Sequence, residues 1–331
     1  MCALLHALQM LNASPQLQRT EDTAPVQRTE DTAPVQRTED TDPSSENRGY
    51  GLKILAIREI AGILPRLTSM HSSPKIWQWP NVLAIDAALI AVLWLLALER
   101  AHSLEITWEA HAVLALSVWL SYVADRLYDV RSRERSSLLS TRHDFSKRYA
   151  RPLWRVWFVA LAVDLLLATQ LNPQQLTKGA QLLIICLIYT LLNQKLSRRF
   201  FPKEICVALI YAGGVQIFLP DTVSSGLYQS FAFLCLLNCL IIGAKEKHID
   251  TKMRVHSLAT LVAERWLSPL AWTGAALVLW KRGDLWQGLA LSFVLLALLH
   301  RYRAHITIES FRVLVDAALL IGGAFHLILL S

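Results

Sequence analysis

Long apolar blocks alternate with short polar connections along the sequence from about Trp77 to the end. Most of these blocks approach the roughly twenty residues that an α-helix needs to cross the hydrocarbon core of a bilayer. We therefore expect an all-α polytopic membrane protein with nine transmembrane helices. The predicted spans are residues 81–99, 110–125, 153–171, 177–194, 203–219, 225–244, 267–280, 286–300 and 311–330.

A different pattern covers residues 1–69. There the unit Gln-Arg-Thr-Glu-Asp-Thr-Ala-Pro-Val begins at Gln18, begins again at Gln27 and then recurs once as a variant. The unit is polar, contains proline and has no amphipathic period, so we expect this segment to be a disordered extension. The exactness of the repeat also allows another interpretation, a mis-assigned start in which translated upstream DNA precedes the true beginning at Met70. In both cases residues 70–331 form the membrane domain.

The composition agrees with a membrane protein, since 53% of the 331 residues are hydrophobic and the mean hydropathy is +0.35. The formal net charge of +7 does not indicate nucleic-acid binding, because Lys and Arg lie between the apolar blocks and form no basic stripe with interleaved aromatic residues. The five cysteines show no Cys-x-x-Cys spacing, which argues against a disulfide framework or a zinc site.

The positions of the basic residues predict the orientation of the chain in the membrane. The connections 126–155, 194–204, 245–265 and 300–312 hold nine, four, five and three Lys or Arg residues, whereas the opposite connections hold four in total. Basic connections tend to stay on the cytoplasmic side. We therefore expect the N-terminus inside and the C-terminus outside.

Two pairs of carboxylates lie at predicted helix ends on this cytoplasmic side. Asp125 and Asp129 follow the second span, and Glu246 and Asp250 follow the sixth, each pair with i, i+4 spacing. If the helices continue through them, each pair stacks on one face, where like charges repel. The negative end of the helix dipole adds to this repulsion. Clustered carboxylates with no His or Cys ligand pattern suit a hard cation such as Mg²⁺, which also binds substrate phosphate oxygens.

Each pair taken alone has an ordinary explanation, in which its acids are solvated loop residues paired with neighbouring Arg or Lys side chains. The occurrence of both pairs at matching depth favours a joint site. Basic residues also follow the fourth span, where Lys195 and Arg198 come after Tyr189. Diphosphate binding and the topology rule explain these basic residues equally well.

The ordered motifs resemble those of the UbiA family of intramembrane prenyltransferases, over about Val82 to the C-terminus. The first motif of that family, Asn-Asp-x-x-Asp-x-x-x-Asp, falls on Ser121, Tyr122, Asp125 and Asp129. The two later carboxylates match this pattern, and the leading Asn-Asp does not.

The second motif of the family, Asp-x-x-x-Asp, falls on Glu246 and Asp250, and Ser257-Leu258-Ala259 follows as it does in family members. Family members also carry a Tyr followed by a basic pair after span four. Tyr189 with Lys195 is similar, at a longer gap.

The resemblance implies a UbiA-like bundle of nine helices, with a central cavity open to the cytoplasmic side of a bacterial inner membrane. It implies Mg²⁺-dependent transfer of a prenyl group from a polyprenyl diphosphate donor to an aromatic or lipid-like acceptor among the membrane lipids. The four motif carboxylates would be catalytic and would bind the metal. The implied diphosphate-binding residues are Arg126, Tyr189, Lys195, Arg198 and Lys247, and candidates for a prenyl channel are Trp119, Tyr122 and Tyr211.

A second interpretation is a non-catalytic UbiA-like binding protein or a transporter. The missing Asn-Asp is compatible with weaker metal binding, a different metal arrangement, a divergent subgroup or loss of turnover, and two acids deep in predicted spans, Asp164 and Asp316, are compatible with a transport route. No motif specifies the prenyl chain length, the acceptor or the oligomeric state.

Overall fold

The computed structural model describes residues 74–131, 140–196, 202–221, 223, 225–252, 258–281 and 284–329. Within these ranges the chain is helical, and no strand occurs. The predicted N-terminal extension lies outside them. The elements of the domain are η1 (Ile76–Gln78), α3 (Trp79–Val82), α4 (Ile85–Ala101), α5 (Trp108–Arg131), α6 (Thr141–Arg148), α7 (Ala150–Ala168), α8 (Pro173–Leu196), α9 (Lys203–Gln216), α10 (Ser225–Lys252), α11 (Leu258–Leu261), η3 (Glu264–Trp266), α12 (Leu267–Trp280), α13 (Asp284–Arg301), η4 (Arg303–His305) and α14 (Ile308–Leu329).

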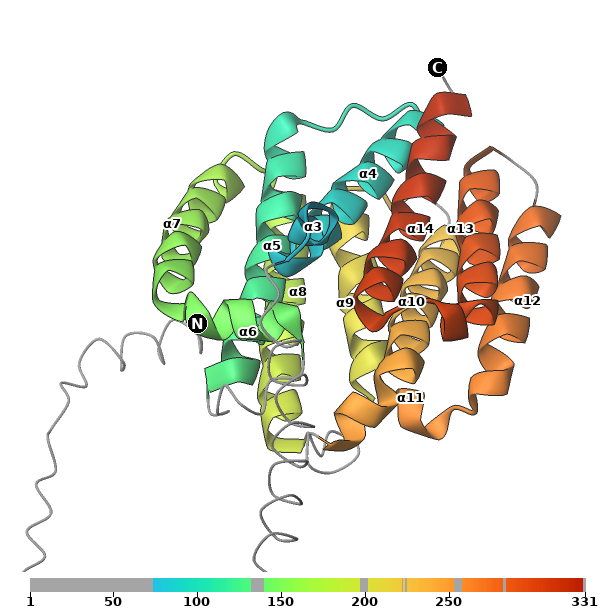
Figure 1. The fold of residues 1–331 in the computed structure, drawn as a ribbon. Helices are drawn as coiled ribbons and strands as arrows, with labels where there is room; N and C mark the ends of the chain where they lie inside the picture. The colour runs from blue at the N-terminus through green and yellow to red at the C-terminus, as the bar shows by residue number, and fades with distance from the viewer. Residues whose placement is uncertain are drawn as a thin grey trace, which may run out of the picture. The chain divides into compact units, whose positions relative to one another are not determined.

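Eight of the nine predicted spans fall on one long helix each: α5, α7, α8, α9, α10, α12, α13 and α14. The first, residues 81–99, begins in α3 and is broken at residues 83–84 before α4. Figure 1 shows these helices side by side, with α7 at one edge of the bundle and α12 at the opposite edge. Two helices continue past their predicted ends through the acidic motifs, α5 to Arg131 and α10 to Lys252. Both acidic motifs therefore lie on helices, which is the condition under which their i, i+4 spacing stacks the acids.

Three of the described helices are long and apolar enough to cross a membrane by themselves. They comprise residues Pro173–Asn193, Ser225–Lys247 and Ile308–Leu329. A fourth span is possible if the bent pair Ile76–Val82 and Ile85–Ala101, whose parts meet at 77°, counts as one. The length and apolar composition of these helices make the chain an integral membrane protein. The nine-span topology stays a prediction.

Burial separates the helices into an inner and an outer group. In α4, α10, α13 and α14 one face of large side chains is packed inside the domain, as Trp94 illustrates by donating from Nε1 to the backbone oxygen of Leu319 at 3.1 Å. In α7 and α8 most apolar side chains are exposed, including Leu165 and Ile184. An apolar outer surface of this kind is suited to contact with lipid chains.

The bend between α3 and α4 depends on side chains from α5. Ala84 takes a left-handed backbone conformation with φ of 59°, which interrupts the regular helical hydrogen bonding of the carbonyl groups before it. The oxygen of Asn81 keeps one backbone donor, the N–H of Ala84 at 3.2 Å. Trp119 donates from Nε1 to the oxygen of Leu83 at 3.0 Å. Arg126 donates from Nη1 to the oxygens of Asn81 at 2.6 Å and Val82 at 2.9 Å. These donors satisfy backbone groups that hydrocarbon could not.

Close backbone approach joins α13 to α14 at two glycines. A Cβ atom added at Gly322 would lie 2.5 Å from the backbone oxygen of Gly288 and would overlap the hydroxyl of Ser292. Small residues permit such contacts between membrane helices. The position of α14, which carries residues of the site described below, therefore depends on this contact.

We expect Gly322→Ala to lower the free energy of unfolding by about 1–3 kcal/mol, because the added methyl group must push two helices apart. Thermal unfolding of the purified protein in detergent measures this change. Gly179→Ala is the matched control, because a Cβ atom added at that helical position meets no heavy atom within 4 Å. An equal loss in both variants would contradict the packing explanation.

Candidate functional site

The first acidic motif lies on the last two turns of α5. Asp125 and Asp129 are both exposed and stand one turn apart on the same helix, which confirms the predicted stacking. Asp129 lies near the short helix α6, with its Oδ2 4.0 Å from Nε2 of His143. Asp125 lies within the electrostatic reach of Lys203 at the start of α9 and of Arg142.

The second acidic motif lies near the end of α10. The structure describes the side chain of Glu246, the first of its two acids. Glu246 is buried, with 7% of its surface exposed. Its Oε1 accepts a short hydrogen bond from Nε of Arg312, and its Oε2 lies 3.7 Å from Nη2 of Arg142. The side chain of Asp250 lies outside the described residues. Glu246 is therefore neutralised by arginine.

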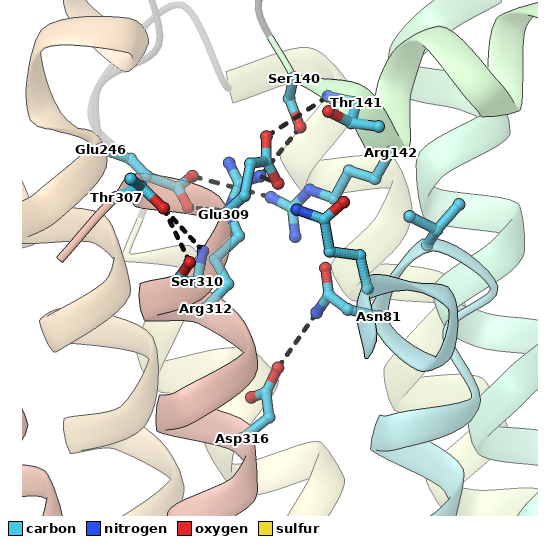
Figure 2. Close-up of polar contacts among 12 residues, drawn as sticks. Asn81, Ser140, Thr141, Arg142, Glu246, Thr307, Glu309, Ser310, Arg312 and Asp316 are labelled. Atoms are coloured by element: carbon cyan, nitrogen blue, oxygen red, sulfur yellow. Dashed lines mark hydrogen bonds and ion pairs between the residues drawn. The ribbon is translucent and has the colours of Figure 1, made fainter. Parts of the chain in front are cut away.

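Arg312 joins three elements at this end of the bundle. It lies near the start of α14, is only 2% exposed, and donates from Nη1 to Oγ of Ser140 at 2.9 Å and to Oε2 of Glu309 at 3.4 Å. The backbone N–H of Thr141 donates to Oε1 of Glu309 at 3.4 Å. Figure 2 shows these groups gathered between α14, α10 and the start of α6. The contacts fix α6 and, with it, Arg142.

Arg142 differs from Arg312 in how completely it is paired. Burial, followed by the neighbouring charge of Arg312, lowers the pKa of the Arg142 guanidinium, whereas the charge of Glu246 raises it. An arginine side chain nevertheless stays protonated in proteins. Its Nε atom is buried and has no hydrogen-bond partner. The arrangement thus holds a desolvated cation whose hydrogen-bonding capacity is only partly used.

Beneath the arginines lies a layer of amides and carboxylates. Asn81 donates from Nδ2 to Asp86 at 2.7 Å and to Asp316 at 3.2 Å, and Asn238 donates to the other oxygen of Asp316 at 3.2 Å. Figure 2 shows Asn81 and Asp316 below Arg142 and Arg312. The deep acid Asp316 thus has two amide donors. The other deep acid, Asp164, accepts a hydrogen bond from Ser117 at 3.0 Å.

The residues expected to bind diphosphate have different positions. Arg126 is buried and uses Nη1 to hold the bend before α4, so part of its side chain is committed to structure. Tyr189 is half-buried on α8, within the electrostatic reach of Asp125. Lys247 is exposed near the end of α10. The side chain of Lys195 and the whole of Arg198 lie outside the described residues.

The expected Mg²⁺ set fits this geometry only in part. Asp125 and Asp129 present exposed carboxylates in the field of several cations, which suits a hard divalent ion that also binds phosphate oxygens. Glu246 does not fit, because a guanidinium faces each of its two carboxylate oxygens. Across the described ranges, no group of three or more His, Cys, Asp or Glu side chains is placed to hold a metal ion. The joint four-carboxylate metal site stays a prediction.

Two basic residues of the site, Arg142 and Arg312, are not among the candidates that the sequence offers, because each lies in a connection whose basic residues the topology rule explains. Lys203 belongs to the basic cluster after Tyr189, which diphosphate binding and topology explain equally well. The sequence does give one indication for Arg312. It lies within the predicted span 311–330, and a charged residue inside a span requires a partner of opposite charge. Nothing in the sequence identifies Glu246 as that partner.

An aromatic series leads from this site into the domain. The rings of Tyr122 and Tyr211 have centroids 6.5 Å apart, those of Tyr211 and Phe231 6.3 Å, and those of Phe231 and Trp94 5.1 Å. Tyr122 precedes Asp125 by one turn of α5. The series ends at a small cavity lined by Trp94, Phe231 and Leu227, among others.

Comparison with known proteins supports the fold. No family model matches this chain, and no curated protein matches it. Among solved structures, the chain is similar to the apo structure of a UbiA homolog from Aeropyrum pernix K1, with a TM-score of 0.51 and 16% sequence identity over 75% of this chain and 99% of that chain. At this identity the likeness shows a UbiA-like fold, and chemistry has to be argued from the site.

We expect Arg126→Gln to lower the free energy of unfolding by about 2–3 kcal/mol, because a charged donor to two buried carbonyl groups is lost. Denaturation in detergent, followed by tryptophan fluorescence, measures the change. The control is Arg151→Gln at an exposed position of α7, which should change stability by less than about 0.5 kcal/mol. If the two variants were equally stable, the role of Arg126 at the bend would be refuted.

Proposed function

We propose that this protein transfers a prenyl group from a polyprenyl diphosphate to a hydrophobic or aromatic acceptor within the membrane. One observation carries the proposal. In a UbiA-like fold, the exposed pair Asp125 and Asp129 lies beside a cationic group formed by Arg142 and Lys203, at the head of an aromatic series. Prenyl diphosphates have the matching division into an anionic head and an apolar tail.

The cationic residues of the site act on the diphosphate head. Departure of diphosphate builds negative charge on its oxygens, and fixed cations stabilise that charge when they are in place before the reaction. Arg142 is held by α6 and by its pairing to Glu246, and Lys203 begins α9. Both cations lie within electrostatic reach of Asp125 before any substrate binds. A Mg²⁺ ion held by Asp125 and Asp129 would add positive charge at the same oxygens.

The aromatic series acts on the other half of the substrate. Loss of diphosphate leaves an allylic cation, and the faces of aromatic rings attract a cation most strongly where water is excluded. Tyr122 is the ring nearest to the acidic pair along α5, and Tyr211 is the next ring in the series. The hydroxyl of Tyr211 donates to the backbone oxygen of Ala87 at 2.6 Å, which fixes its ring.

Asp125→Asn should lower the rate of prenyl transfer about 100-fold or more, because it removes a carboxylate ligand of the proposed Mg²⁺ ion, whose positive charge would stabilise the departing diphosphate. Diphosphate release from labelled prenyl diphosphates of several lengths, with Mg²⁺ and detergent-solubilised protein, measures this rate.

The control for this prediction is Asp221→Asn at the opposite end of the bundle. Asp221 is 77% exposed and pairs with Lys178, and exposed pairs contribute little to stability. Its substitution should leave the rate unchanged. A wild-type protein that binds donors without turning them over would instead support the non-catalytic alternative.

The ring of Tyr211 generates a separate prediction. Tyr211→Leu should slow transfer by about 5- to 30-fold, the kinetic equivalent of losing about 1–2 kcal/mol of cation–π stabilisation. Tyr211→Phe keeps the ring and loses the hydrogen bond to Ala87, so it should change the rate by less than about threefold. Single-turnover measurements with saturating donor distinguish the two variants. Equal loss in both would assign the effect to the hydroxyl group.

A further inference from the structure

Each oxygen of the Glu246 carboxylate faces an arginine rather than a group that could share a metal ion with it. Oε1 faces the Nε of Arg312, and Oε2 faces the Nη2 of Arg142. Glu246 and Arg312 are both buried, at 7% and 2% exposure. A divalent cation bound to Glu246 would lie beside two guanidinium groups in a poorly solvated environment, where repulsion between like charges is strong. The local charge is already balanced by protein.

The two guanidinium groups have different amounts of hydrogen-bonding capacity left. Arg312 contacts Glu246, Ser140 and Glu309, so several of its donors are engaged. Arg142 has one long ion pair of 3.7 Å with Glu246 and a buried Nε without an acceptor. Its side chain is 23% exposed. It is therefore the arginine that can still receive an anion.

We propose that Arg312 replaces a divalent cation at the second acidic motif, so that Glu246 is a positioning residue that orients Arg142 toward the phosphate group of the substrate. Arg142 then contacts the anion directly, and the need for a divalent cation is confined to the first motif, Asp125 and Asp129. This inference rests on the proposed function and deepens it. It concerns Glu246 and makes no statement about Asp250.

The chemistry agrees with this division of roles. A guanidinium group forms paired, charge-assisted hydrogen bonds to phosphate oxygens, and it does so without the dehydration that Mg²⁺ requires. Glu246 can hold Arg142 only loosely at 3.7 Å, so an incoming phosphate can take over its Nη and Nε donors. Arg312 keeps Glu246 neutralised after that exchange.

The first measurement is the binding of Mn²⁺, a spectroscopic substitute for Mg²⁺, to the full-length protein in detergent by electron paramagnetic resonance. Asp125→Asn should weaken Mn²⁺ binding by at least the roughly 10- to 100-fold that loss of an outer-shell partner already costs, because it removes a ligand, whereas Glu246→Gln should leave the affinity within about twofold of wild type. If Glu246→Gln weakens Mn²⁺ binding as much as Asp125→Asn does, the inference is overturned.

Glu246→Gln leaves Arg312 buried without its carboxylate and could prevent folding. A double variant, Glu246→Gln with Arg312→Met, removes both charges, and buried ion pairs are often replaced in this way without loss of stability. Its Mn²⁺ affinity should equal that of wild type. A tenfold loss in this folded double variant would equally overturn the inference, by the same standard as a lost ligand.

The second measurement is calorimetric binding of inorganic pyrophosphate in the presence of EDTA. Wild type should bind pyrophosphate without metal, and Arg142→Gln should weaken this binding by about 10- to 100-fold through loss of charge-assisted hydrogen bonds. Arg142→Lys should restore part of it, because the charge returns without the planar pair of donors. Absence of pyrophosphate binding by wild type in EDTA would refute the arginine contact.

The two measurements separate this inference from the proposed function, which depends on turnover of prenyl diphosphates. A wild-type protein that turns over donors but loses Mn²⁺ on substitution of Glu246 contradicts only the role assigned to the arginines. A protein that binds pyrophosphate through Arg142 in EDTA and turns over no donor contradicts only the proposed transferase reaction.

Discussion

The buried ion pair between Arg312 and Glu246 determines how the functional end of this protein is assembled. An isolated buried charge costs several kcal/mol, and breaking a buried pair by removing one partner costs about 3–5 kcal/mol. Glu246 near the end of α10 and Arg312 near the start of α14 can avoid that cost only together. The second partners of Arg312, Ser140 and Glu309, then bring the start of α6 to the same place. Arg142 is positioned as a consequence, so one charge-pairing requirement fixes three elements and the cation of the site.

The same requirement for satisfied polar groups explains the bend between α3 and α4. Hydrocarbon supplies no hydrogen bonds, so carbonyl groups released at a break have to find donors within the protein. Arg126 and Trp119 on α5 supply them. In return, α5 is fixed against the bend over the length that carries Tyr122 and Asp125. Arg126, which was expected from the sequence to bind diphosphate, therefore contributes by fixing the part of α5 that carries Tyr122 and Asp125.

The likeness to a solved UbiA homolog structure is one of fold at 16% identity, and the site shows where this chain differs from the pattern of the family motifs. The leading Asn-Asp of the first motif is absent, and the first acid of the second motif pairs with arginines. The same helical framework can therefore supply positive charge at this end of the bundle from arginine side chains, from a metal ion or from both. Function has to be assigned from the residues of this chain, because the framework alone does not specify the chemistry.

The amino-acid sequence by itself determined the helical class and the approximate place of the long helices, because these depend on apolar block length, and the 3.6-residue period required the first acidic pair to stack only if its helix continued. It did not determine that α5 and α10 run on through the motifs to Arg131 and Lys252. Only the tertiary structure decided the partners: Arg312 with Glu246, Arg126 with the α3 carbonyl groups, and Asn81 with two aspartates. The pairing of charged side chains from helices that are distant in sequence depends on how those helices pack. The spacing of charged residues along the chain does not specify these pairs.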